Sequence, residues 1–194
     1  MNVSEAIRTR RSVGAVKNDE VPRQQIEQIL EAGTWAPTHR RTEPWRFFVM
    51  QGEGRSKLAA ALADTEAAEK GIDPSPEQRE ELLASALKKV SRSPVVIAVG
   101  CEPVDSPKVI PLEETLSVAS AIQNMLLEAH ALGLGAVWRS GSSCYHPLMA
   151  ERFGLGPNGQ MLGFLYVGYP DREPGEGKRE PFESKTVWID AAES

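Results

Sequence analysis

The sequence predicts one domain of mixed α and β structure. An unbroken apolar run at 94–101 is typical of a strand that is covered on both faces, and residues 112–132 repeat their apolar positions every three or four residues, as a long buried helix does. Helix-like and strand-like segments alternate along the rest of the chain. With 194 residues, 41% of them hydrophobic, the chain is long enough to bury a core, and its length favours a single domain, 1–194.

The N-terminal half begins with two predicted helices. Residues 3–9 form a short helix, and a second helix starts at Pro22, keeps one face apolar and ends near Ala36-Pro37. The aromatic and β-branched segment 45–50 predicts a strand. Helical spacing then returns at 55–69.

Capping signals delimit the later helices. The segment Ser75-Pro76-Glu77-Gln78 has the form of a capping box with proline at the first helical position, so a helix should run from there to about Ser91. Residues 65–81, around this start, are charged and contain proline and glycine; they form either a mobile cover or, as we favour, a solvated connection between helices. The helix 112–132 should stop at Gly133. The remaining predicted elements are a strand at 135–139, a short helix at 147–154 and a strand at 161–167.

The C-terminal arm, 170–194, has a different composition. Residues 170–184 are crowded with proline, glycine and charge, as in a linker. The apolar segment Thr186-Val187-Trp188-Ile189 follows and is β-like. It can dock on its own domain or add a strand to another subunit, and we favour the second arrangement.

Composition excludes several classes of protein. The net charge of −5 and pI near 5.4 argue against a general nucleic-acid binder, so any anion site must be local. Cys101 and Cys144 have no neighbouring cysteine, and the three histidines form no HxxxH pair, so we expect neither a disulfide scaffold nor a metal site. We see no signal peptide and no apolar run of membrane-spanning length. A soluble, cytoplasmic protein is expected.

Two clusters of arginine and hydroxyl groups indicate an anion site. The first is Arg10-Arg11-Ser12, and the second is Trp138-Arg139-Ser140-Gly141, at the end of a predicted strand. Guanidinium forks and hydroxyl donors suit a phosphate monoester, which two such clusters could clamp. The alternative interpretations are a solvated arginine pair near the chain start and an edge arginine paired with a helix.

Other motifs have simpler explanations. The segment 154–159 satisfies GxGxxG, but it follows a helix and precedes a strand, the reverse of the dinucleotide-binding order, so it predicts a turn. Cys144 and His146 resemble a nucleophile and base only in sequence, and we interpret them as a packed cysteine and a loop histidine. Ser140 lacks the GxSxG context of a hydrolase.

Four motifs in order carry a resemblance to a known family: Arg10-Arg11-Ser12; Gly33-Thr34-Trp35-Ala36-Pro37-Thr38-His39; Glu43-Pro44-Trp45-Arg46-Phe47; and Trp138-Arg139-Ser140-Gly141. The chain resembles the FMN-dependent nitroreductases over nearly its whole length, and in particular their compact NAD(P)H-dependent subgroup. The resemblance implies an α+β fold, a layered sheet flanked by helices. It also implies a homodimer with two FMN molecules at the subunit interface.

The resemblance also implies which residues bind FMN. Arg139 and Ser140 would lie at the phosphate and ribityl end and Trp138 beside the flavin, while Trp35 and His39 would come from the other subunit. Together with the first cluster, the implied FMN contacts are Arg10, Arg11, Ser12, Trp35, His39, Trp138, Arg139 and Ser140. We expect Arg10 and Arg139 to hold phosphate and Arg11 to stabilise charge on the reduced flavin. Arg179 is a candidate for the C-terminal cation that longer relatives carry.

The implied activity is an oxidoreductase that passes hydride from NADH or NADPH through FMN to a nitroaromatic, quinone or similar acceptor by ping-pong exchange. No catalytic base is required, because the flavin supplies the redox chemistry. Two alternatives are a flavin-binding or storage protein, and an enzyme of the same fold that uses reduced flavin for other chemistry, such as dehalogenation or oxidative breakdown of flavin.

Overall fold

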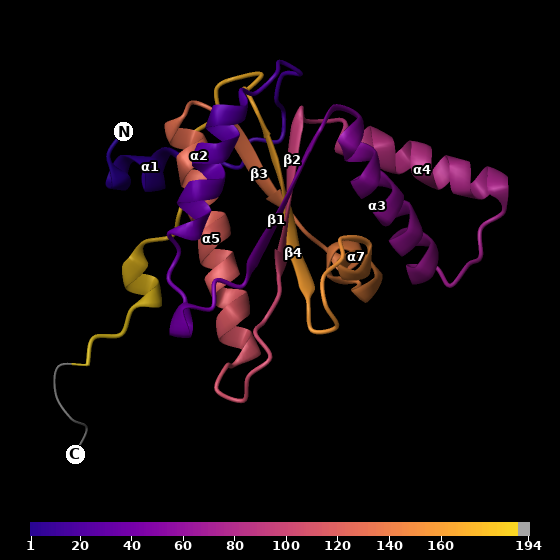
Figure 1. Cartoon of the computed structure of the whole chain (residues 1–194). Coiled ribbons are helices and arrows are strands. Elements are labelled where there is room, and N and C mark those ends of the chain that lie inside the picture. Colours follow the sequence, from indigo (N-terminus) through magenta and orange to yellow (C-terminus); the bar gives the residue numbers. More distant parts are fainter. Residues whose placement is uncertain (190–194) are drawn as a thin grey trace.

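A four-stranded antiparallel sheet lies between two layers of helices in the computed structural model, which describes residues 1–189 (Figure 1). The strands follow the spatial order β1 (Trp45–Gln51), β2 (Val95–Cys101), β4 (Gln160–Gly168) and β3 (Gly135–Arg139). All three neighbouring pairs are antiparallel. The predicted α+β class is confirmed, and each strand lies within one residue of its predicted bounds.

The strand β2 is central, as its unbroken apolar run predicted. All seven of its residues are buried, and it pairs with β1 on one side and β4 on the other. Val95, Ile97 and Val99 belong to the apolar cluster on one face of the sheet, whereas Val96 and Ala98 belong to the cluster on the opposite face. Because both faces are covered, the strand has no polar alternation.

Each of the two helical layers contains a different set of helices. The first contains α2 (Arg23–Thr34) and α5 (Pro111–Ala131), with α1 (Val3–Thr9) beside α5. The second contains α3 (Ser56–Glu69), α4 (Pro76–Val90), α6 (Ser142–Tyr145) and α7 (Pro147–Arg152). Figure 1 shows these layers on opposite sides of the sheet. The edge strand β3, which carries Trp138 and Arg139, therefore lies between the two helical layers.

Local signals explain where several helices begin. The Ser75 Oγ accepts a hydrogen bond from the Gln78 N–H at 3.3 Å, and the Gln78 Oε1 accepts one from the Ser75 N–H at 3.0 Å, so the predicted capping box is present. A second capping box, Asn2 with Glu5, opens α1. Pro22 is the N-cap of α2 and not its first helical residue, a difference of one position.

Four short helical segments escaped the sequence analysis because they are shorter than the window that periodicity needs. They are η1 (His39–Arg41), η2 (Gly52–Arg55), α6 and η3 (Phe182–Lys185). The segment 65–81 lies in the α3–α4 hairpin, which Figure 1 shows at the end of the molecule farthest from the C-terminal arm. The choice between a solvated connection, which we favour, and a mobile cover stays a prediction.

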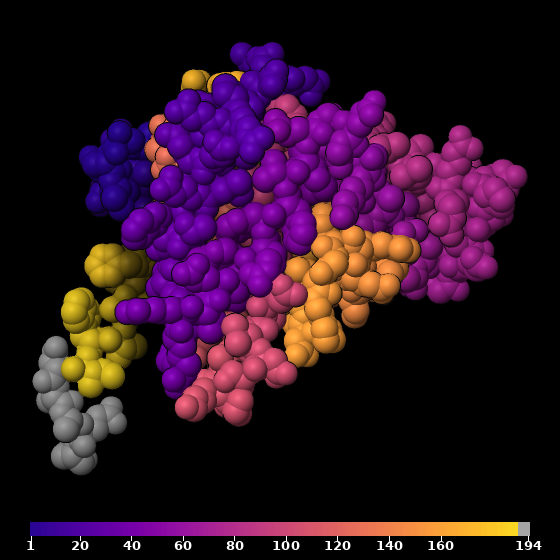
Figure 2. All heavy atoms as spheres, viewed as in Figure 1, coloured from indigo at the N-terminus to yellow at the C-terminus, as the bar shows by residue number. Residues whose placement is uncertain are grey.

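The C-terminal arm leaves β4 and runs back past the N-terminal residues before it extends away from the body (Figures 1 and 2). Val187, Trp188 and Ile189 are exposed and form no strand in the single chain. Their exchange with another subunit stays a prediction, and residues 190–194 of the arm lie outside the described part. Within residues 1–189, no helix combines the length and apolar character needed to cross a membrane.

Candidate functional site

The first arginine cluster lies beside the edge strand that carries the second. Ser12 forms a parallel bridge with Ala136 of β3, and the Val13 N–H donates to the Ala136 carbonyl at 3.0 Å. Val16 forms an antiparallel bridge with Pro170, just after β4. The segment after α1 thus connects to two neighbouring strands, which brings the two predicted clusters to one edge of the sheet.

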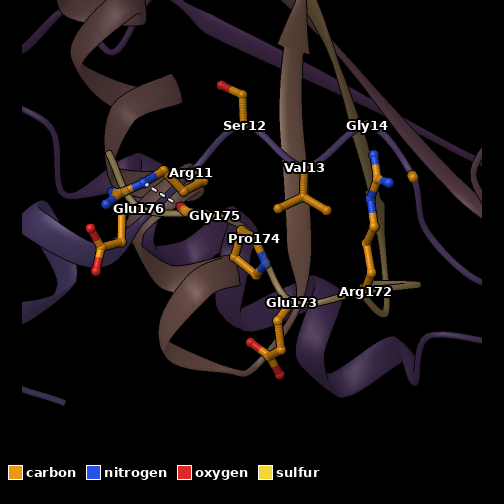
Figure 3. Close-up of a pocket in the computed structure, with 10 residues that line it drawn as sticks. Arg11, Ser12, Val13, Gly14, Arg172, Glu173, Pro174, Gly175 and Glu176 are labelled. Carbon is orange, nitrogen blue, oxygen red and sulfur yellow. Dashed lines mark hydrogen bonds between the residues drawn. The ribbon is translucent and has the colours of Figure 1, made fainter. Parts of the chain in front are cut away.

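Arg11 uses its donors on backbone carbonyls. Its Nη1 donates to the carbonyls of Arg8, at 2.7 Å, and Arg10, at 2.8 Å, while its Nε donates to Gly175 at 3.2 Å (Figure 3). A Cβ at Gly177 would overlap the Arg11 guanidinium, so the arm passes directly against it. Arg11 therefore ties the C-terminal arm to the end of α1.

A hollow of about 570 Å³ opens beside this contact. It is lined by residues 11–15 on one side and 172–176 on the other. Figure 3 shows the Val13 side chain pointing toward Pro174 of the arm, whereas the Ser12 hydroxyl points away from it. The walls of the hollow include backbone, hydroxyl and cationic groups, the donor types that bind oxyanions, together with the carboxylates of Glu173 and Glu176.

Arg10 has a buried donor with no partner among the described residues. Its Nη1 atom is buried and forms no hydrogen bond there. Burial, followed by the positive charges of Arg179 and Arg11, lowers the pKa of the Arg10 guanidinium. The His130 Nε2 lies 2.8 Å from the Thr9 hydroxyl; burial, followed by the charges of Arg10 and Arg11, lowers the pKa of His130, and Glu5 opposes this shift. This end of α1 is therefore a half-buried cationic cluster that an anion would stabilise.

Arg139 lies in a second hollow, of about 350 Å³, on the α3–α4 side of the sheet. Its guanidinium lies over the Tyr166 ring, 5.3 Å from the centroid. Lys89, Arg92 and residues 140–144 line the same hollow. Burial raises the pKa of Tyr166, and the charges of Arg139 and Arg92 oppose that rise. Arg139 thus lines a different hollow from the one that Arg11 and Ser12 line.

Trp138 and Arg139 point to opposite faces of the sheet. The Trp138 Nε1–H donates to the Leu162 carbonyl at 3.0 Å, and its ring covers Gly163, on the side of α2 and α5. Arg139 lies over Tyr166, which belongs to the opposite cluster. Successive strand residues alternate faces, so these neighbours in sequence cannot contact the same group from one side. Ser140, after the strand, is exposed and lines the second hollow.

The two residues expected from the other subunit lie outside both hollows. Trp35, at the end of α2, is 79% exposed and lines a separate shallow hollow with residues 1–3. His39, in η1, is exposed, and its Nδ1 lies 3.5 Å from the Glu113 Oε2. Their contact with a cofactor held by another subunit stays a prediction.

Sequence reasoning missed two cations of the second hollow, Lys89 and Arg92. The signal for them was available, because both precede the central strand and the strand end carrying Arg139 was already a candidate. Cys144 is buried and the His146 Nδ1 accepts a hydrogen bond from the Leu148 N–H at 3.2 Å, which confirms their structural interpretation. In the described part of the chain, no group of three or more His, Cys, Asp or Glu residues could hold a metal ion.

Comparison with known proteins gives a consistent result. The family model "Nitroreductase family" matches residues 7–169. YdjA of Escherichia coli (strain K12), named as an NAD(P)H nitroreductase, is 33% identical over 170 residues, which cover 88% of this chain and 89% of YdjA.

Solved structures agree. The nitroreductase-like family protein from Bacillus cereus has a TM-score of 0.83 and 30% identity, covering 98% of this chain and 97% of its own. A nitroreductase with bound FMN from Bacteroides fragilis has a TM-score of 0.70 and 26% identity, covering 98% of this chain and all of the other. The family model spans most of the chain, and the relatives match it nearly end to end. The protein therefore belongs to the nitroreductase family.

Proposed function

We propose that the protein is an FMN-dependent oxidoreductase that uses NADH or NADPH to reduce nitroaromatics, quinones or similar acceptors. The observation that carries this proposal is the buried, unpartnered Nη1 of Arg10 beside the like charges of Arg11 and Arg179. A buried donor without an acceptor costs about 1–3 kcal/mol, and more when it is charged. A phosphate monoester supplies both the acceptor oxygens and the negative charge that this cluster lacks.

The residues present fit FMN. We expected Arg10 and Arg139 to hold the phosphate, but Arg139 lines the second hollow, so Arg179, whose charge acts on Arg10, takes its place in the proposal. Residues 11–15, which follow Arg10, line the first hollow. The names of the relatives add support, since the Bacteroides fragilis structure contains FMN and YdjA is named for NAD(P)H. When bound, FMN supplies the redox chemistry, two-electron reduction by NAD(P)H and then reduction of an acceptor in ping-pong exchange. The protein's own contribution is to bind, orient and balance charge.

We also infer a homodimer with FMN at the subunit interface. Trp35 is 79% exposed, and Leu112 and Leu116 of α5 are 64% and 56% exposed. Exposed large apolar side chains of this kind are typical of a surface that meets another protein. The apolar end of the arm, Val187 to Ile189, is exposed in the single chain and suits exchange with the second subunit. Light scattering of the full-length protein tests the dimer, and a monomeric mass would contradict it.

The experiment that tests the function is the visible spectrum of the purified protein, followed anaerobically after NADH or NADPH is added. We expect a flavin spectrum, or one that appears on incubation with FMN, and rapid bleaching by at least one nicotinamide. Arg10→Met should weaken FMN binding by about tenfold or more, because one charged hydrogen bond contributes about 1.5–3 kcal/mol. Arg23→Met is the matched control, since the Arg23 side chain is 88% exposed and pairs only with Glu27 among the described residues.

Each outcome has a clear meaning. Bound flavin that stays oxidised with both nicotinamides would favour storage over catalysis. Reduced flavin that reacts with no nitroaromatic or quinone would favour other chemistry on the same fold. A protein that binds no FMN would contradict the proposal, together with the phosphate role of Arg10.

A further inference from the structure

The second hollow contains two guanidinium groups that no carboxylate neutralises within residues 1–189. Arg92 and Arg139 both line it, and neither forms an ion pair with a described residue. Lys89 differs, because its Nζ lies 3.4 Å from the Glu66 Oε2. The other nearby acid, Glu69, accepts a hydrogen bond from the Ser143 hydroxyl at 3.1 Å. The hollow thus keeps a net positive charge.

Most N–H donors of Arg11 are already engaged elsewhere, and only its Nη2 forms no hydrogen bond with a described residue. Three hydrogen bonds to the carbonyls of Arg8, Arg10 and Gly175 occupy its Nε and Nη1. Moving the guanidinium onto a ligand would break the contact that holds the arm (Figure 3). Arg11 is therefore better suited to position the arm, and with it Arg179, than to meet charge on a flavin ring.

Gly14 connects the two hollows. It lines the first hollow, and a Cβ built on it would lie 3.2 Å from the Nη2 of Arg139. The Arg139 guanidinium thus occupies the space into which a side chain at position 14 would project. A ligand whose phosphate binds beside Arg10 and whose body follows residues 11–14 would reach Arg139 next.

We propose that Arg139 and Arg92, and not Arg11, stabilise the negative charge that FMN gains on reduction. This inference rests on the proposed function. Hydride transfer adds two electrons and one proton, so the cofactor gains one negative charge, which gathers at N1 and the C2 carbonyl. Arg139, which lies over the ring of Tyr166, and Arg92, which lines the same hollow, have no acidic partner among the described residues and favour that charged form over the oxidised one. Reduction therefore becomes easier without a proton donor.

The test compares the affinities of oxidised and reduced FMN in Arg92→Met, Arg139→Met and Arg11→Met, with Arg23→Met as control. Oxidised binding is titrated by absorbance, and the midpoint potential is measured by equilibration with reference dyes. We expect Arg92→Met and Arg139→Met each to lower the ratio of the affinities for reduced and oxidised FMN about tenfold. For a two-electron couple, this change lowers the midpoint potential by about 30 mV. Sulfite, whose addition to the flavin also places negative charge on the ring, should bind these variants more weakly by a similar factor.

The lysine variants Arg92→Lys and Arg139→Lys keep the charge and guard against a merely structural effect, so their potentials should stay close to that of the original protein. In Arg11→Met, we expect looser attachment of the arm, seen as faster proteolysis after residue 170, and an unchanged potential. An unchanged potential in both Arg92→Met and Arg139→Met, or a shift confined to Arg11→Met, would overturn the inference. Absence of FMN binding in the unmodified protein would instead contradict the proposed function.

Discussion

The contact between Trp138 and Gly163 offers a sharp test of how the edge of the sheet is built. A Cβ on Gly163 would overlap the Nε1 and Cδ1 atoms of the indole, which leans across this residue to donate its hydrogen bond to Leu162. Gly163→Ala must therefore displace the ring. The same substitution at Gly54 meets nothing within 4 Å and serves as the matched control.

The expected cost of Gly163→Ala is about 2–3 kcal/mol of unfolding free energy. Overpacking a well-packed site costs about 1–3 kcal/mol, and losing a hydrogen bond costs about 0.5–1.5 kcal/mol. Trp138 is 37% exposed, so its ring can rotate toward water without moving the backbone. The cost should therefore stay below the sum of the upper values of these two effects. For Gly54→Ala we expect a change of about 0.5 kcal/mol or less.

Urea unfolding of the two alanine variants measures these costs, and a double-mutant cycle with Trp138→Ala isolates the contact. In the Trp138→Ala background the overlap disappears, so Gly163→Ala should become nearly neutral, with a coupling energy of at least about 1 kcal/mol. If Gly163→Ala costs the same in both backgrounds, its effect comes from the strand backbone and not from the indole, and the reasoning fails.

Three further predictions concern single groups. Ser75→Ala removes the acceptor of the α4 capping box and should destabilise the protein by about 1 kcal/mol in urea unfolding; no loss would mean that the box is not formed in solution. Because burial and two arginines lower the pKa of His130, this residue should oppose folding as the pH falls through about 6.5, and Arg10→Met should raise its pKa part of the way back in an NMR titration. An unchanged pKa of His130 in Arg10→Met would show that the charge of Arg10 does not act on His130. Burial raises the pKa of Cys101 to about 11 and that of Cys144 to about 12, so neither thiol should react with iodoacetamide at pH 8 before the protein unfolds, and rapid labelling of either would contradict its buried position.

The fold was largely predictable because its strongest signals are local. The apolar run before Cys101 and the periodic positions of α5 report burial directly, and the Ser75 box marks a helix start without any tertiary information. The order of the strands was less accessible. Placing β4 between β2 and β3 depends on long-range pairing, which no local pattern encodes.

The residue types of the candidate site were predictable from the sequence. The side of the sheet that each side chain faces, and the groups it contacts, were less so. The sequence indicated two arginine clusters, and the bridge between Ser12 and Ala136 brings their backbones together at one edge of the sheet. It did not indicate that Arg139 and Trp138 face opposite sides, although strand alternation implies this once the strand is accepted. Nor could it indicate that the Arg11 Nε donates to Gly175 of the arm, since that contact depends on where residues far along the chain return.

The loop that carries His39 shows why some of the site lies beyond local reasoning. Arg40, Arg41 and Glu43 have φ values of 61°, 58° and 47°, a left-handed conformation that costs a non-glycine residue about 1–2 kcal/mol. Distant contacts hold this shape, because the Thr42 hydroxyl donates to the buried Glu114 at 2.6 Å and the Arg40 Nε donates to the Lys108 carbonyl at 3.0 Å. Neither contact is visible in the sequence around position 40, where propensity alone would favour an ordinary turn. Strain that persists only because its surroundings enforce it is typical of functional segments, and here it fixes the loop from which His39 would reach a second subunit.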